Sequence, residues 1–81
     1  ELVGYPNPTS DVLSYTFSTE EKSDYQLNVT DLSGRTIMHE TRNAQDGENT
    51  SDINVTSFAK GIYIMTIQIG TETSRFKFTV Q

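Results

Sequence analysis

Apolar and polar residues alternate in short runs along the chain, and the spacing typical of an amphipathic helix is nearly absent. A period of two places successive side chains on opposite faces, as in a strand with one buried face. Two runs, "DVLSYTF" and "DYQLNVTD", each have one apolar face: Leu13, Tyr15 and Phe17 in the first, and Tyr25, Leu27 and Val29 in the second. The pattern predicts a β protein.

Two further strands are predicted near the C-terminal end. In "IYIMTIQI", residues 62–69, apolar side chains point to both faces over the first half, which predicts the central strand. We expect a tight hairpin turn in "DLSGR", and a single turn at Ser57–Lys60 that ends at Gly61. The last run, "RFKFTVQ", is expected to point three apolar side chains inward and three polar ones outward: Phe76, Phe78 and Val80 against Arg75, Lys77 and Thr79.

The segment "TRNAQDGENTSD", residues 41–52, is almost entirely polar and interrupts the alternation. We expect it to make few core contacts and to lead into only a weak strand near Thr50–Ile53. With a short run at Leu2–Tyr5, the chain holds about seven strands at intervals of about 8 to 12 residues. This predicts an all-β fold, an antiparallel immunoglobulin-like β-sandwich of short strands. A closed barrel is the alternative, and it is less favoured because it imposes a common strand tilt.

Both prolines of the chain flank Asn7 in the segment "YPNPTSD". Pro6 and Pro8 each lack a backbone donor, fix φ and push the preceding residue toward extended geometry. We therefore expect a stiff corner that pairs with no strand. Inside it, Asn7, Thr9 and Ser10 are expected to hydrogen-bond to their own neighbouring backbone.

Composition narrows the possible classes of protein. At 81 residues the chain suits one domain, residues 1–81, able to bury about 60 to 65% of its unfolded surface. Eleven acidic and six basic residues give a net charge of −5, which disfavours nucleic acid as a partner. The absence of cysteine excludes disulfides and thiolate chemistry. The longest apolar run is far shorter than the roughly 20 residues of a membrane-spanning helix. Because the chain starts at Glu1, we expect it to be cut from a larger precursor.

No catalytic centre, metal site or cofactor is predicted. The one histidine, His39, has no partner expected for nucleophilic catalysis, and no G-x-S-x-G segment is present. Glu20 and Glu21 lie in a charged connection, where a solvated pair is the ordinary outcome. The segment "DGENTSD" resembles a calcium loop but lacks the central glycine and distant glutamate of an EF-hand. Four tyrosines could form a sugar-stacking platform, although three of them fall on apolar strand faces.

Four segments, in order and at this spacing, carry a more specific resemblance: "YPNPTSDVL", "LNVTDLSGRTI", "FAKGIYIMTI" and "RFKFTVQ". Together they resemble the C-terminal sorting domain of the Bacteroidetes type IX secretion system, over essentially the whole chain. The resemblance implies a set of family motif positions, namely Pro6, Asn7, Pro8, Asp31, Gly34, Gly61 and Tyr63. Lys77 is similar to the lysine of the terminal motif, whereas Gln81 departs from the commoner basic ending.

The resemblance also implies a function. Members of the family are cargo tags: the precursor enters the periplasm, the translocon reads the folded tag, and the passenger crosses the outer membrane to the cell surface. A sortase-like peptidase then typically cuts ahead of the tag and joins the passenger to anionic lipopolysaccharide. The tag is a substrate and not an enzyme. The expected translocon-recognition residues are those of the last strand: Arg75, Phe76, Lys77, Phe78, Thr79, Val80 and Gln81.

Two other functions compete with the secretion tag. A carbohydrate-binding or adhesive module would need an exposed aromatic platform or a metal site, for which the tyrosines and residues 46–52 are the candidates. An interdomain spacer is less favoured, because we expect the chain to end at its last strand. An unpaired strand edge would also permit a weak homodimer.

Overall fold

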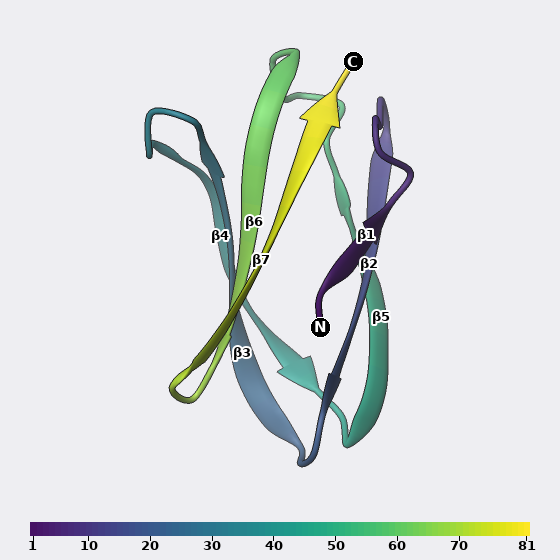
Figure 1. Cartoon of the computed structure of the whole chain (residues 1–81), viewed down its shortest axis with the longest axis vertical. Coiled ribbons are helices and arrows are strands. Elements are labelled where there is room, and N and C mark those ends of the chain that lie inside the picture. Colours follow the sequence, from purple (N-terminus) through teal and green to yellow (C-terminus); the bar gives the residue numbers. More distant parts are fainter.

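The computed structural model describes all residues 1–81 and consists of two antiparallel sheets packed face to face (Figure 1). One sheet has the order β1-β2-β5 and the other the order β4-β3-β6-β7. The predicted immunoglobulin-like β-sandwich of seven strands is confirmed. The strands are β1 (Val3–Tyr5), β2 (Val12–Thr19), β3 (Ser23–Asp31), β4 (Thr36–Ala44), β5 (Gly47–Asn54), β6 (Gly61–Ile69) and β7 (Glu72–Val80).

One hydrophobic core fills the space between the sheets, as the alternating pattern predicts. The apolar faces predicted for β2 and β3 are buried, and β6 lies between β3 and β7, which confirms its central position. No helix in the structure is long and apolar enough to cross a membrane. The core contains fifteen buried residues: Leu2, Leu13, Tyr15, Phe17, Tyr25, Leu27, Val29, Ala44, Ile53, Val55, Tyr63, Met65, Ile67, Phe78 and Val80.

The prediction for residues 41–53 is correct in part. A strand includes Thr50–Ile53 and Ala44 is the one buried residue of the segment 41–52, but the strands on both sides of the turn are longer than predicted. β4 continues to Ala44 and β5 begins at Gly47, so only two residues connect them, and β5 pairs with β2 along its whole length. The segment is polar because its side chains occupy outward faces and an edge, whereas Ala44 and Ile53 enter the core. Asn49 closes the turn, since its side chain accepts from the Gln45 N–H and donates to the Gln45 carbonyl, both at 2.9 Å.

Arg42 closes one open side of the sandwich by reaching from β4 to the other sheet. One guanidinium nitrogen, Nη1, donates to the hydroxyls of Tyr15 and Ser51, each at 3.0 Å, and to a β5 carbonyl. The Tyr15 and Tyr25 hydroxyls share a hydrogen bond of 2.7 Å, and Glu40 pairs with Arg42 Nε at 2.8 Å. Burial and the bond to Tyr15 raise the pKa of Tyr25, so its hydroxyl stays neutral. The alternation of apolar and polar residues does not predict this network.

Candidate recognition surface at the C-terminal strand

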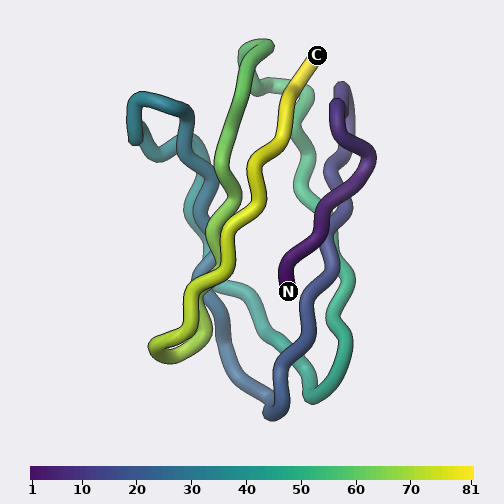
Figure 2. The backbone as a smooth tube through the Cα atoms, in the orientation of Figure 1, coloured from purple at the N-terminus to yellow at the C-terminus, as the bar shows by residue number.

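β7 is an edge strand that pairs along its full length with β6 and runs beside the N-terminal segment (Figure 2). In the register between the two strands, Ile64 lies opposite Lys77 and Ile62 lies opposite Thr79. Since side chains of directly opposed residues share a face, these four point away from the core. Phe78 and Val80, on the other face, are buried.

The corner around Asn7 pairs with β7, which corrects the expectation that it pairs with no strand. The Thr9 N–H donates to the Thr79 carbonyl and the Gln81 N–H donates to the Thr9 carbonyl, both at 2.9 Å. The Asn7 side chain accepts from the Thr79 N–H at 3.0 Å and donates to the Lys77 carbonyl at 3.4 Å. We call these four hydrogen bonds the terminal clasp.

The Asn7 amide replaces a peptide group in the clasp. Thr9 bonds to residues 79 and 81 as in a parallel ladder, and the next pair of that ladder would join residue 7 to residues 77 and 79. The side chain of Asn7 supplies the acceptor and donor of that pair. Of the local hydrogen bonds expected in the corner, the structure contains one, from Thr9 Oγ1 to the Val12 carbonyl at 2.8 Å. The peptide bonds before Pro6 and Pro8 are cis.

The clasp covers only the end of the β7 edge. Because the backbone groups of Thr79 point away from β6, those of Thr73, Arg75 and Lys77 do so as well, by the alternation of an antiparallel pair. No strand pairs with this part of the edge. Apart from the Lys77 carbonyl, which bonds to Asn7, the outward backbone groups of residues 73–77 are therefore donors and acceptors to which another chain could add.

The seven expected recognition residues divide between surface and core. Arg75 and Lys77 are exposed and take part in neither of the two ion pairs of the structure, Arg35–Asp31 and Arg42–Glu40. This confirms that both cations point outward. Gln81 is exposed within the clasp, whereas Phe78 and Val80 are buried and are thus inaccessible to a partner while the domain is folded.

Phe76 closes the side of the sandwich between β7 and β1. Its ring is half-buried and lies so close to Gly4 that a Cβ added there would be 2.5 Å from Cε2 of the ring. A side chain at position 4 would therefore displace the ring. No sequence pattern indicates the role of Gly4, because the contact joins residues at opposite ends of the chain.

The family motif positions Asp31 and Gly34 form a self-contained turn between β3 and β4. The Asp31 carboxylate accepts from Ser33 Oγ at 2.7 Å and from the backbone N–H groups of Ser33 and Arg35 at 3.0 Å. These hydrogen bonds, led by that of the Ser33 hydroxyl, hold the pKa of Asp31 below its usual value. Gly34 has a φ of 90°, which L side chains rarely adopt.

Tyr63 holds the loop that precedes β6, and Gly61 is the first residue of that strand. The Tyr63 hydroxyl donates to the Ala59 carbonyl, and its ring packs between Phe58 and Phe78 with centroid distances of 5.3 and 5.7 Å. The turn begins earlier than predicted, since the Phe58 N–H donates to the Val55 carbonyl at 3.0 Å. It begins there because the buried Val55 anchors it to the core.

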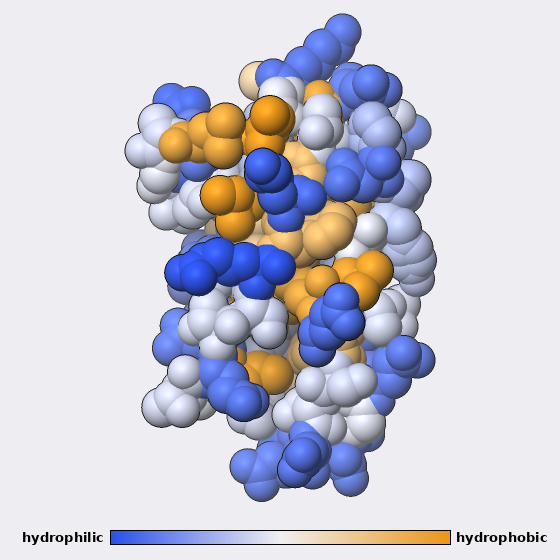
Figure 3. Space-filling model, viewed as in Figure 1, coloured by the Kyte–Doolittle hydropathy of each residue, from blue (hydrophilic) through white to orange (hydrophobic).

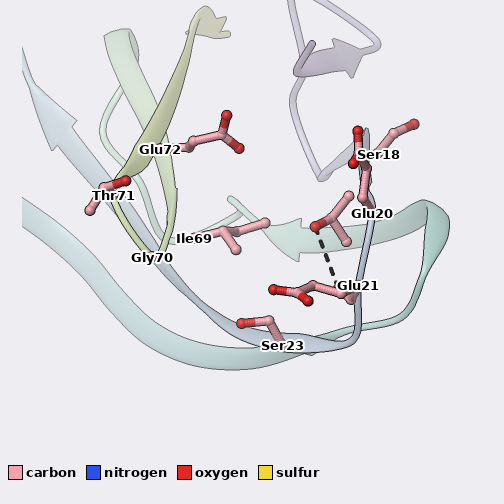
Figure 4. A pocket seen from close by; sticks show the side chains of 9 residues that line it. Ser18, Glu20, Glu21, Ser23, Ile69, Gly70, Thr71 and Glu72 are labelled. Carbon is pink, nitrogen blue, oxygen red and sulfur yellow. Dashed lines mark hydrogen bonds between the residues drawn. The ribbon is translucent and has the colours of Figure 1, made fainter.

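The other candidate chemistry lies elsewhere and is dispersed. Glu20 and Glu21 line an open groove of about 660 Å³ between the β2–β3 and β6–β7 turns, where Ile69 is the one hydrophobic side chain (Figure 4). His39 Nδ1 is hydrogen-bonded to Asn28 Oδ1 on an exposed strand face. No group of three or more His, Asp or Glu side chains is placed to hold a metal ion. Three of the four tyrosines are core residues: Tyr15, Tyr25 and Tyr63.

The fold defines an immunoglobulin-like β-sandwich, and β7 has a partly free edge and two exposed cations without an ion pair. Residues 4–81 match the family described as the secretion system C-terminal sorting domain. The chain therefore belongs to this family, the C-terminal sorting domain of type IX secretion. This is a family of sorting signals and not of catalysts, and membership implies transit to the outer membrane or cell surface with a passenger.

Comparison with solved structures shows the fold alone. A β-glucosidase from Listeria innocua, solved in complex with glucose, is similar with a TM-score of 0.51 and 15% sequence identity. The similarity covers 99% of this chain and 16% of that one, so the chain corresponds to a small part of the larger protein. A comparison with curated protein sequences found no match.

Proposed function

We propose that residues 1–81 are the signal domain of a larger precursor and direct an N-terminal passenger across the outer membrane by type IX secretion. The observation that carries the proposal is the family match over residues 4–81. The accessible edge and cations of β7 support it, because a receptor can engage them while the domain stays folded. In this proposal the translocon recognises β7 in the periplasm, and a sortase-like peptidase then removes the domain at the cell surface.

Fusion of residues 1–81 to a periplasmic reporter tests this function. In a bacterium that carries the secretion system, the reporter should reach the cell surface, and in a strain without the translocon it should stay in the periplasm. Loss of the domain from the surface-exposed reporter, detected by mass, is the expected result of sortase cleavage. A reporter that stays periplasmic in both strains would contradict the proposal.

A weak homodimer by edge-strand pairing belongs to the same proposal. β1, β4 and β5 each have one edge without a paired strand, and residues 73–77 of β7 add a fourth. Such edges pair with other chains unless they are covered. Sedimentation velocity over a range of concentrations should show a rising average mass; a constant monomer mass would exclude the dimer.

A further inference from the structure

Two hydrophobic side chains and two cations lie together on the outer face of the four-stranded sheet. Ile62 and Ile64 on β6 point outward, next to Lys77 and Arg75 on β7. Ile62 is 41% exposed although it is a large aliphatic residue in a central strand. We call these four residues the β6–β7 patch. Hydrophobic surface gathers toward the upper end of β6 and in the seam between β7 and β1, with hydrophilic side chains around it (Figure 3).

The charge of this face is opposite to that of the whole chain. The domain carries a net charge of −5, yet its cations Arg75 and Lys77 lie on a sheet face whose one acidic residue is Asp24. Asp24 is hydrogen-bonded to Asn43. Across the sheet, Arg75 lies in line with Asn28 of β3, and Asp24 is four residues from Asn28 along that strand. This separation is about 14 Å, which exceeds the electrostatic screening length of about 8 Å. Neither cation makes an ion pair within the domain.

We propose that the β6–β7 patch docks an acidic protein surface with an apolar centre, which belongs to a component of the export machinery. This inference rests on the proposed function and names the partner chemistry of its recognition strand. The isoleucines would enter the apolar centre, while Lys77 and Arg75 pair with carboxylates at its rim. Charge complementarity selects an acidic occupant, because Arg75 and Lys77 are exposed and make no ion pair within the domain. The competing occupant is the outer face of the other sheet in a second copy, where Tyr5 lies in line with Asp52, and a cross-link between two tags would reveal it.

The patch differs from a signal read as an extended C-terminal peptide, because part of it comes from another strand. Ile62 is remote from β7 in the sequence and joins the patch only through the β6–β7 pairing. A receptor that docks here reads a folded surface. Val12, on the outer face of the other sheet, is a matched comparison because it is also 41% exposed and aliphatic.

Site-specific photo-crosslinking during export tests the patch. A photoreactive residue replaces Ile62 or Val12 in the reporter fusion, and cross-linked products in living cells are identified by mass spectrometry. We expect the probe at position 62 to label one envelope protein at an acidic segment, with at least about tenfold less product from position 12. Equal labelling from both positions, or a product between two tags, would overturn the inference.

Charge reversal gives the second measurement. Lys77→Glu should lower both the cross-link and the surface-exposed reporter about tenfold or more, because like charges would then face each other. Lys22→Glu makes the same charge change at another exposed site and should leave both unchanged. Both variants should melt as the parent does, since neither cation makes an ion pair.

The outcomes separate this inference from the proposed function. In a charge swap, a carboxylate of the partner near the cross-link is changed to lysine and combined with Lys77→Glu in the tag. Restored export in this pair would establish the contact. Normal export by the unaltered tag together with normal export by Lys77→Glu would overturn the patch and leave the sorting function intact. Failure of the unaltered tag to reach the surface would overturn the sorting function itself.

Discussion

At the residue scale, the side-chain amide of Asn7 makes the two hydrogen bonds to β7 that a backbone peptide group would make in a parallel ladder. Replacement by alanine removes both of its hydrogen bonds to β7, and exposed bonds of this kind contribute about 0.5 to 1.5 kcal/mol each. We expect Asn7→Ala to lower the free energy of unfolding by about 1 kcal/mol, measured by urea denaturation. The amide hydrogen of Thr79 should exchange with solvent faster than the lowered free energy of global unfolding alone would cause.

Two variants calibrate this prediction. Asn7→Asp keeps the acceptor for the Thr79 N–H and loses the weaker donor bond to the Lys77 carbonyl, so it should retain most of the stability. Asn28→Ala removes an exposed asparagine that bonds to His39 on the outer sheet face, and it should leave Thr79 exchange unchanged. Equal exchange at Thr79 in all three variants would show that Asn7 does not hold the strand.

Gly4 is the second residue whose role appears only in three dimensions. A Cβ at this position meets three atoms of the Phe76 ring at 2.5 to 3.0 Å. Because the ring is half-buried, it can shift, and we expect Gly4→Ala to cost about 1 kcal/mol, at the low end for overpacking. In a double-mutant cycle, Phe76→Leu should suppress that cost by removing the clashing atoms. Additive losses in the cycle, measured by thermal melting, would contradict the contact.

At the scale of elements, the β3–β4 turn makes stability depend on pH. Hydrogen bonds to the Asp31 carboxylate lower its pKa in the folded state. Since the unfolded chain then binds the proton more tightly, the stabilisation is present above a pH of about 4 and is lost as pH falls through the folded pKa. Asp31→Asn should remove this part of the acid dependence. The measurement is the urea midpoint at pH 7 and at about pH 3, and an identical acid loss in both proteins would contradict the assignment.

The contact between β4 and β5 depends on Arg42. Arg42→Ala leaves the Tyr15 and Ser51 hydroxyls, and a β5 carbonyl, without their charged donor. We expect a loss of about 2 to 3 kcal/mol in urea unfolding, typical of a partly buried charged donor that makes several hydrogen bonds. Arg42→Lys, with one nitrogen in place of the planar fork, should recover only part of it. Full recovery by lysine would show that charge alone is sufficient.

The same elements show how far the sequence predicts the structure. Alternation identified the inward faces of β2, β3 and β6 because each strand buries one face against the facing sheet, which is a local property. It missed most of β5, an edge strand whose polar outward residues look like a loop. The clasp and the Arg42 network were also missed, since both join segments distant in sequence.

The motif residues were found through the family resemblance, and the structure shows what several of them do. Asp31 organises a turn, Tyr63 anchors a loop, and Asn7 bonds to the last strand. The alternation correctly placed Lys77 and Arg75 on the outside. It did not reveal that Ile62 and Ile64 lie beside them, because that proximity depends on the β6–β7 register.

At the scale of the whole molecule, the clasp joins the two ends of the chain, so an intact last strand depends on residues far from it in sequence. Deletion of residues 1–9 removes β1 and the clasp but leaves the sequence of β7 unchanged. If the translocon reads a folded surface, export of a reporter with this truncated tag should fall sharply, although every expected recognition residue is still present. A linear tail signal would be unaffected.

Thr9→Pro also tests whether export depends on the clasp, and it does so without deletion of a strand. It removes the backbone donor that bonds to the Thr79 carbonyl, together with the buried Thr9 hydroxyl that bonds to the Val12 carbonyl, and it keeps the length of the chain and the hydrophobic core. We expect the domain to stay folded by circular dichroism, amide exchange to accelerate at residue 81, and export to fall less than with the truncation. Undiminished export of the truncated tag would mean that the machinery reads the terminal residues as an extended peptide, in which case the sandwich protects the signal before it is read.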